Sequence, residues 1–356
     1  MSIEVISSAD PAGLERFDAI IDVRSPAEFA EDHVPGAVNL PVLTNEERAE
    51  VGTIYVQRSR FLARRIGAAH VARNIARHLE TALADWTGAF APLVYCWRGG
   101  QRSNAMATIL SQVGWRTTVL EGGYKTYRRM VQRRLYDEVF GLRLVLLGGG
   151  TGTAKTEMLG RLAKRGLQVL DLEGLAAHRG SLFGGFAGEP QPSQKMFESR
   201  LLAALDALDP TRPVVVEAES SKIGERMTPP ALWKLMQSAP RIELVAPRAE
   251  RARYLISAYK DIVENRAALE EAFGRLPTHP GRERLEGWRK LADAGEFAAL
   301  AEALVELHYD PAYARSSKKD GRPKLGVVAM ETLSDANQET AADEIVRLVG
   351  TLGGFD

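Results

Sequence analysis

Short apolar runs alternate with helix-like segments along the first 124 residues. The runs are Ala19–Val23, the turn and short strand of Val34–Asn39, the Pro92–Val94 segment and Arg116–Leu120. Between them lie a helix start at Ser25–Phe29, a long helical stretch over about 60–85 and a second one over 104–113. A cap, a first-turn proline and an acidic residue mark the first of these helices. This alternation predicts an open parallel α/β sheet.

A second α/β pattern begins at Leu142. Its predicted strands are Leu144–Leu147, Gln168–Leu172, Pro213–Glu217 and Arg241–Val245, with helices over 156–164 and about 194–207. Residues 249 to about 308 are mostly helical in pattern, with a break near 274–281. We therefore expect a first domain over 1–124, a basic connector helix over 125–141, and a second α/β domain with a helical C-terminal region over 142–356.

Composition narrows the class of protein. The chain has 46 basic and 46 acidic residues, so only local patches indicate a nucleic-acid partner. A single cysteine excludes an internal disulfide and an all-cysteine metal site, and no metal site is predicted. No leader pattern and no bilayer-length apolar run are present, so we expect a cytoplasmic protein without a membrane partner. The pattern does not indicate the oligomeric state.

The single cysteine, Cys96, directly follows an apolar strand and precedes glycines and a helix, in the order Tyr-Cys-Trp-Arg-Gly-Gly-Gln-Arg-Ser. Backbone N–H groups and a helix N-terminus at such a position favour a thiolate and bind an anion beside it. Arg98 and Arg102 add positive charge. We therefore predict a reactive thiol, with Cys96, Arg98 and Arg102 as catalytic residues.

A glycine-rich loop lies between the strand at 144–147 and the next helix. It reads Gly-Gly-Thr-Gly-Thr-Ala-Lys-Thr and resembles the phosphate-binding loop G-x-x-x-x-G-K-[ST], except that Ala154 replaces the second glycine. The predicted phosphate-binding residues are Gly149, Gly150, Thr151, Gly152, Thr153, Lys155 and Thr156. Magnesium is possible at Thr156, and Glu217 stands where such domains usually place a magnesium-organising aspartate.

Two further groups of residues are candidates for contact with substrate. The polar, glycine-rich stretch from His178 to Lys195, which includes Phe183 and Phe186, is long enough to close over a phosphate site. Its possible lid or substrate residues, taken with the strand-end glutamate, are Arg179, Gln191, Ser193, Gln194 and Glu217. Positive charge on the connector makes Arg128, Arg129, Arg133 and Arg134 candidates for contact with nucleic-acid phosphates. An arginine cluster at Arg58, Arg60, Arg64 and Arg65 is another candidate.

The first domain resembles a rhodanese. The resemblance rests on four segments that follow one another in that family's order: Asp22–Arg24 with Glu28–Phe29, His33–Asn39, the Cys96 loop and Leu120–Tyr124. A rhodanese followed by a phosphate-binding-loop domain is a rare order of domains. Together with the Cys96 loop and the stretch around Gln191–Gln194, it makes about residues 5–350 resemble the bacterial tRNA 2-selenouridine synthases.

The resemblance implies a two-step modification of tRNA carrying 2-thiouridine at the wobble position. A geranyl group from geranyl diphosphate is transferred to the sulfur, and selenium from selenophosphate then replaces the geranylated sulfur. Cys96 would act in the selenium step, either accepting selenium or assisting displacement, and the loop at 149–156 would hold the diphosphate. No tightly bound cofactor is implied.

Two other functions also fit the sequence. Cys96 and Arg102 followed by Ser103 also fit the C-x5-R-[ST] pattern of cysteine-dependent phosphatases. The loop is one residue longer than in sulfur-transferring rhodaneses, which suits a larger anion such as selenophosphate or a phosphoester. The other alternative is a nucleotide-binding, tRNA-binding protein with a non-catalytic rhodanese module.

Overall fold

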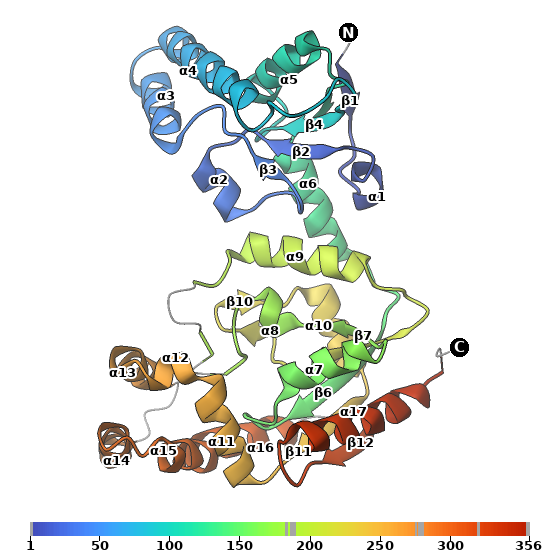
Figure 1. Cartoon of the computed structure of the whole chain (residues 1–356), viewed down its shortest axis with the longest axis vertical. Coiled ribbons are helices and arrows are strands. Elements are labelled where there is room, and N and C mark those ends of the chain that lie inside the picture. Colours follow the sequence, from blue (N-terminus) through green and yellow to red (C-terminus); the bar gives the residue numbers. More distant parts are fainter. Residues whose placement is uncertain are drawn as a thin grey trace. The chain divides into compact units, whose positions relative to one another are not determined.

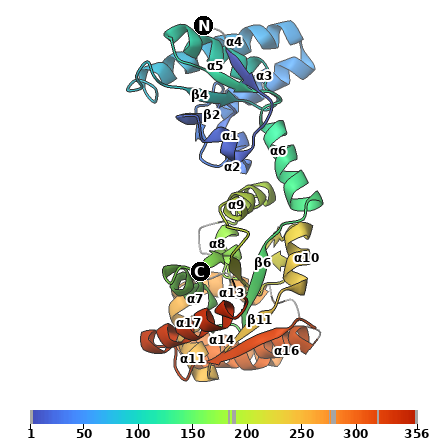
Figure 2. The same cartoon turned by 90° about the vertical axis from the view of Figure 1, so that its right-hand side faces the viewer.

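The computed structural model describes residues 3–181, 184–185, 190–274, 276, 281–318 and 321–353 (Figures 1 and 2). Phe183 and Phe186 of the glycine-rich stretch lie outside these residues. The chain forms two compact units, one made of residues 1–138 and 193–206, the other of 139–192 and 207–356. Both units are parallel α/β folds, as the pattern of apolar runs predicts, and the second carries a helical C-terminal region.

The first unit is built on a five-stranded, all-parallel sheet of order β1-β5-β4-β2-β3. The strands are β1 (Glu4–Ile6), β2 (Ala19–Asp22), β3 (Val38–Asn39), β4 (Pro92–Tyr95) and β5 (Thr118–Leu120). The central strand β4 is buried along its whole length, because helices cover both faces of the sheet. Its carboxyl end leads directly to Cys96.

Helices α3 (Asn45–Gln57), α4 (Arg60–Glu80) and α5 (Gln101–Val113) lie on one side of this sheet, and α1 (Pro11–Leu14) and α2 (Pro26–Glu31) on the other (Figure 1). The predicted start of α2 is confirmed by a capping box between Ser25 and Glu28. Helix α4 ends at Glu80, and residues 81–85 form turns rather than the predicted last helical turn. The sequence patterns identified neither β1 nor α3.

The connector and one later helix complete the first unit. The connector is α6 (Tyr124–Gln132) followed by a π-helical turn, η1 (Arg133–Asp137), instead of one helix to residue 141. Helix α9 (Gln194–Asp206) belongs to the same unit, although the segments before and after it belong to the second. The buried Glu198 of α9 pairs with Arg128 and accepts a hydrogen bond from the Tyr136 hydroxyl at 2.7 Å. These contacts fix α9 on the connector.

The second unit contains another all-parallel sheet, of order β12-β11-β6-β8-β7. Its strands are β6 (Arg143–Gly149), β7 (Gln168–Leu170), β8 (Pro213–Glu217), β11 (Arg241–Val245) and β12 (Lys324–Ala329). A separate hairpin joins β9 (Lys222–Ile223) and β10 (Arg226–Met227). The strand order changes direction around β6, the position where open α/β sheets bind ligands beyond the carboxyl ends of their strands.

The helices of the second unit form two groups. Those near the sheet are α7 (Lys155–Lys164), α8 (Leu172–Leu175), α10 (Pro230–Ser238) and α17 (Asp335–Gly350). The helical region after β11 consists of α11 (Arg248–Ala258), α12 (Lys260–Val263), α13 (Arg266–Gly274), α14 (Arg282–Asp293), α15 (Phe297–Leu304), the π-helical η2 (Val305–Tyr309) and α16 (Asp310–Lys318). Within the described ranges, none of the helices has both the length and the apolar character needed to cross a bilayer.

Candidate functional site

The thiol of Cys96 lies at the end of β4, where backbone groups of the following loop surround it. The Gly100 N–H donates a hydrogen bond to Sγ at 3.3 Å, and the Ser103 hydroxyl lies 3.3 Å from the same atom. Cys96 is only 3% exposed. Burial alone would raise its pKa, but hydrogen bonds from Ser103, Arg98 and Gly100 outweigh burial, and the pKa of Cys96 is lowered. The predicted backbone cradle for a thiolate is therefore present.

Two glycines let the chain after β5 close against this loop. Gly99 and Gly123 both have positive φ, at 65° and 57°. A Cβ on Gly123 would lie 2.2 Å from the Cys96 carbonyl oxygen, and one on Gly99 would lie 2.8 Å from backbone atoms of the β5 turn. The Tyr124 N–H donates to that Cys96 carbonyl at 2.8 Å. Only glycine fits both positions without displacing the loop.

A buried ion pair lies within the Asp22–Arg24 segment of the rhodanese pattern. Asp22 and Arg24 are 0% and 1% exposed, and their side chains meet at 2.6 Å. The guanidinium carbon of Arg24 lies 4.1 Å from the ring centroid of Tyr124, whose hydroxyl donates to Asp32 at 2.7 Å. Burial raises the pKa of Asp32. These contacts hold β2, α6 and the residue that follows α2 in one arrangement beside the thiol loop.

The two arginines of the thiol loop have different surroundings. Arg98 is exposed, and its backbone faces the thiol. The Arg102 guanidinium donates to the Glu28 carboxylate at 2.8 Å, and this pairing lowers the pKa of Glu28 against the effect of burial. An arginine that already binds a carboxylate carries less charge toward an incoming phosphoryl group. The Glu28 carboxylate therefore competes for this guanidinium with any anion that enters the Cys96 loop.

The loop after β6 has the geometry of a phosphate-binding loop. It leads into α7, whose first residue is Lys155, and the Lys155 Nζ donates to the Gly149 carbonyl at 3.1 Å. The Thr156 hydroxyl donates to Glu173 at 3.1 Å. Ala154, which replaces the usual glycine, is buried and adopts the left-handed conformation, with φ 58° and ψ 36°. Its methyl group thus lies just before the first helical turn, at a position where glycine is strain-free.

Residues of this loop line one cavity with side chains from outside the motif. Residues 151–157 form one wall, and the others are Glu173, Arg179, Gly180, Ser181, Tyr254, Leu255, Ala258 and Tyr259. The buried Arg251 of α11 braces the loop from behind, because it donates to the Thr151 carbonyl at 2.9 Å and pairs with Asp310 at 2.7 Å. Arg251, Tyr254 and Tyr259 were not predicted from the sequence, since no motif connects α11 with the loop.

Four carboxylates lie beside the phosphate-binding loop, at the ends of β7 and β8. Glu217 is fully buried and accepts the Leu172 N–H at 3.0 Å. Burial, together with the charges of Asp171 and Glu173, raises the pKa of Glu217 well above its usual range. Burial and the charge of Glu173 raise the pKa of Glu219 to about 8, although Lys155 opposes the shift. The described residues contain no group of three His, Cys, Asp or Glu side chains that could hold a metal ion.

The predicted lid residues take different positions. Arg179 lines the phosphate-loop cavity, where it pairs with Asp261 at 2.9 Å and lies 4.9 Å from the Tyr259 ring centroid. Gln191 instead donates to the Ala176 carbonyl at 2.8 Å and accepts from the Glu225 N–H at 2.6 Å. Ser193 and Gln194 start α9 in the first unit, where Ser193 accepts the Met196 N–H.

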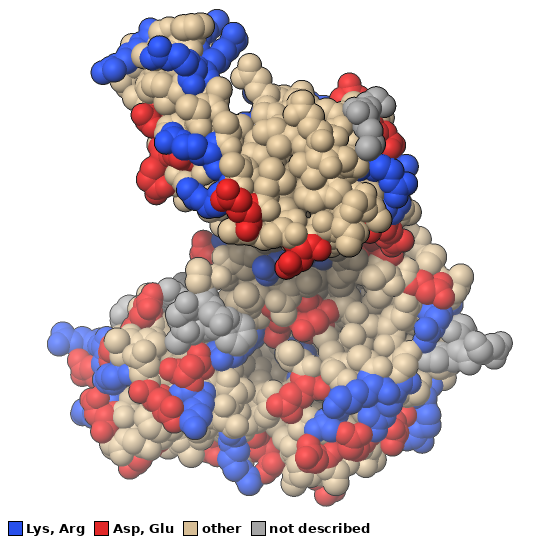
Figure 3. Space-filling model, turned by 45° about the horizontal axis from the view of Figure 1, so that its top comes forward, with Lys and Arg blue, Asp and Glu red and all other residues tan. Residues whose placement is uncertain are grey.

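Three of the four connector arginines make ion pairs within the first unit. Arg128 pairs with Glu198, Arg134 with Asp206 at 2.5 Å, and Arg133 with Glu138 at 2.8 Å. Arg129 is exposed. Positive side chains also gather at the end of the first unit where α3 meets α4 (Figure 3), and the exposed arginines there are Arg58, Arg60, Arg64 and Arg65.

The fold and the two sites define a class: a rhodanese-type unit with an activated cysteine, joined to a phosphate-binding-loop unit. The rhodanese-like domain family matches residues 10–130, and the tRNA 2-selenouridine synthase AAA domain matches residues 142–284. The chain belongs to the tRNA 2-selenouridine synthase family, a family of tRNA-modifying enzymes.

Two relatives show the extent of the match. The tRNA 2-selenouridine synthase of Cupriavidus pinatubonensis is 33% identical over 336 residues, which is 84% of this chain and 89% of the relative. The enzyme of the same name from Pseudomonas fluorescens is 33% identical over 335 residues, covering 85% and 89%. Both matches therefore extend over the two units.

Replacing Ala154 with glycine should stabilise the protein. The left-handed conformation destabilises an L-residue by about 1–2 kcal/mol, and glycine avoids this strain. Glycine also increases the conformational entropy of the unfolded chain, which offsets part of the benefit. We therefore expect a net gain of about 1 kcal/mol in the free energy of unfolding. Denaturant titration measures it. The control is Ala163→Gly on the exposed face of α7, which should instead cost about 1 kcal/mol. Loss of stability in both variants would contradict the conformation of Ala154.

Ser103→Ala should make the thiol less acidic, since it removes a hydrogen bond that stabilises the thiolate. Because Cys96 is the single cysteine, the rate of alkylation by iodoacetamide reports on this residue alone. We expect the midpoint of the rate's pH profile to move to higher pH in Ser103→Ala. Thr108→Ala, on the exposed face of the same helix, should leave it in place; an unshifted Ser103→Ala profile would mean that Ser103 does not stabilise the thiolate.

Glu219 should make the protein less stable as the pH rises. Its folded pKa lies above that of an unfolded glutamate, so between the two values the native state keeps a proton that the unfolded chain has lost, and stability falls until the folded pKa is passed. Between about pH 6 and about pH 8, the free energy of unfolding should therefore fall in the wild type. In Glu219→Gln, measured in EDTA, this fall should be smaller by about 1–2 kcal/mol. The exposed Glu225→Gln should keep the wild-type slope. Equal slopes in all three proteins would refute the assignment.

Proposed function

We propose that this protein converts 2-thiouridine at the wobble position of tRNA into 2-selenouridine, through an S-geranylated intermediate. One observation carries the proposal: the same chain has an activated thiol at the end of β4 and a phosphate-binding loop at the end of β6. Its relatives with this pair of units are named for 2-selenouridine synthesis in tRNA.

In the first step, the sulfur of 2-thiouridine attacks C1 of geranyl diphosphate. The C–S bond forms as the C1–O bond breaks, the electron pair leaves with diphosphate, and the N3 proton passes to water. Lys155 and the loop N–H groups neutralise the charge that develops on the leaving group. A magnesium ion, if used, has oxygen ligands available in Thr156 and Glu173, and it would polarise the diphosphate.

In the second step, selenophosphate supplies selenium to C2 of the modified uridine. The C–Se bond forms, geranylthiol leaves with the electrons of the C2–S bond, and water cleaves the Se–P bond to release phosphate. Alkylation of the sulfur is what turns it into a leaving group. We assign this step to the Cys96 loop, whose Gly100 N–H donates to the sulfur and whose thiol has a lowered pKa.

The half-reactions should be separable by mutation. Cys96→Ala should accumulate geranylated thiouridine without selenouridine, because only the second step uses the thiol. Lys155→Ala should slow geranylation on the order of 100-fold, as expected when a charge-stabilising group is lost. Mass spectrometry of nucleosides from tRNA incubated with geranyl diphosphate and selenophosphate measures both products.

The controls and contrary outcomes are distinct. Lys164→Ala, at the exposed end of the same helix as Lys155, should behave as wild type. Normal selenouridine formation in Cys96→Ala would overturn the role of the thiol. A burst of phosphate from an aryl phosphate that is lost in Cys96→Ser would favour the phosphatase alternative, and tight nucleotide binding without any change in tRNA would favour the binding-protein alternative.

A further inference from the structure

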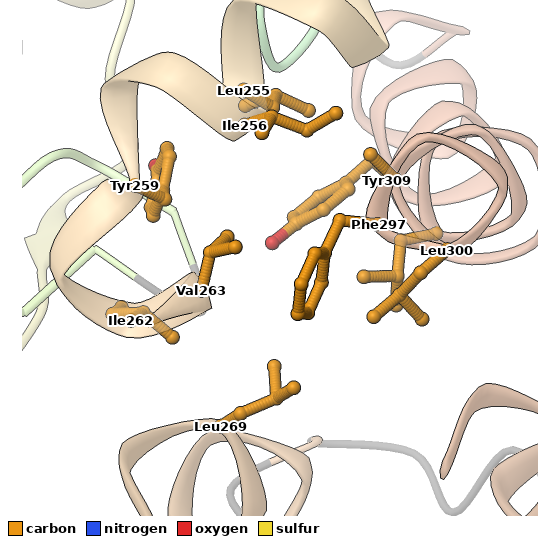
Figure 4. A pocket seen from close by; sticks show the side chains of 11 residues that line it. Leu255, Ile256, Tyr259, Ile262, Val263, Leu269, Phe297, Leu300 and Tyr309 are labelled. Atoms are coloured by element: carbon orange, nitrogen blue, oxygen red, sulfur yellow. The ribbon is translucent and has the colours of Figure 1, made fainter. Parts of the chain in front are cut away.

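An apolar pocket lies among the helices that follow β11, within the second unit. Its empty space, including the open mouth, is about 510 Å³. Figure 4 shows the rings of Phe297 and Tyr309 on one side of this space, with Tyr259 and Val263 across from them and Leu269 at the lower end. The remaining lining residues are Leu255, Ile256, Ile262, Leu300, Ala301 and Leu304. Almost every exposed atom of the lining is carbon.

This apolar pocket adjoins the cavity of the phosphate-binding loop. Leu255 and Tyr259 line both spaces. The Tyr259 hydroxyl lies 2.6 Å from the Ser181 hydroxyl, and the Arg179 guanidinium carbon lies 4.9 Å from the Tyr259 ring centroid. Tyr259 thus has polar neighbours, Ser181 and Arg179, on the side of the phosphate-binding loop, and its ring carbons line the apolar pocket. One ligand could therefore place an anionic head on the loop and a hydrocarbon tail in the pocket.

The lining distinguishes between two kinds of diphosphate. A nucleotide places ribose hydroxyls and base nitrogens next to its phosphates, and each of these needs a hydrogen-bond partner when it is buried. The apolar pocket offers almost none. A branched hydrocarbon chain needs no such partner and displaces no strongly bound water from apolar walls. The chemistry of the pocket consequently matches a prenyl tail and not a nucleoside.

The pocket is also a gap in an otherwise packed cluster. Ile262, Leu269, Leu300 and Leu304 belong to the core that joins α12, α13 and α15. Protein interiors are normally filled to the density of organic crystals, and an apolar void loses dispersion contacts on every wall. If the ligand of the neighbouring anion site has an apolar chain, that chain can fill the void and restore the lost dispersion contacts.

We propose that this pocket holds the hydrocarbon chain of the allylic diphosphate, and that Val263 and Phe297 set the chain length the protein accepts. The proposal rests on the proposed function for its donor, but it adds the residues that select the donor. Val263 is only partly buried, so a larger side chain there has room to enter the pocket without displacing the core. Removing the Phe297 ring lengthens the same space.

The test is a reciprocal change of chain-length preference. Prenyl transfer to thiouridine-containing tRNA is measured with dimethylallyl, geranyl and farnesyl diphosphate, which have five, ten and fifteen carbons. Val263→Trp should lower the geranyl-to-dimethylallyl ratio of kcat/KM at least about tenfold, and Phe297→Ala should raise the farnesyl-to-geranyl ratio by a similar factor. Opposite shifts in two variants cannot arise from misfolding. Ser257→Trp, on the exposed face of α11, should keep the wild-type ratios.

Binding measured by calorimetry, without tRNA, gives an independent readout. Wild type should bind geranyl diphosphate at least about tenfold more tightly than inorganic diphosphate, and Val263→Trp should remove that difference while keeping the affinity for inorganic diphosphate. If wild type transfers no prenyl group, the proposed function fails. If it transfers geranyl but neither variant changes the ratios, or if Ser257→Trp changes them equally, the pocket assignment fails alone. Equal affinity for ATP and geranyl diphosphate would also overturn it.

Discussion

Both candidate sites depend on one constraint: the N–H groups that follow a central parallel strand have no strand partner and must find an acceptor. After β4 they surround the Cys96 sulfur, and after β6 they form the loop that Lys155 closes by bonding to Gly149. A helix begins directly after each loop, so its N-terminal dipole adds to the same field. The backbone at each site therefore favours a negatively charged group, and the side chains would decide which anion is bound.

The side chains around the second loop create a conflict of charge. Four carboxylates lie beside the phosphate-binding loop, and full ionisation of all four would repel an anionic ligand. Burial resolves part of the conflict, since it raises the pKa of Glu217 well above its usual range and that of Glu219 to about 8, so Glu219 keeps a proton near neutral pH. Lys155 opposes the shift at Glu219, so a ligand that takes the lysine charge away favours protonation further. Anion binding and carboxylate protonation are thereby coupled.

Local motifs predicted the strand, glycine loop and helix at both sites, because these elements are consecutive in the chain. The helix at 194–206 was also predicted, but its place in the first unit was not, since the Arg128–Glu198 pair joins residues far apart in sequence. The same reason explains why Arg251 was missed behind the phosphate loop. Strand β12 was missed because its burial alternates irregularly at a sheet edge, and Lys324 gives it a polar start. Predictions failed wherever long-range packing decided the structure.

If the proposed function holds, the apolar pocket would let a phosphate-binding loop serve a donor that is not a nucleotide. The loop itself recognises only phosphate oxygens, so the selectivity must come from the walls next to it. Here α11 supplies both kinds of wall: Arg251 braces the loop, and Leu255, one helical turn on, faces the apolar space. Movement of α11 would alter the loop and the pocket together. A chain seated against Leu255 and Tyr259 would hold the helix in place, and in this way the hydrocarbon part of the donor would help to order the loop that stabilises its leaving group.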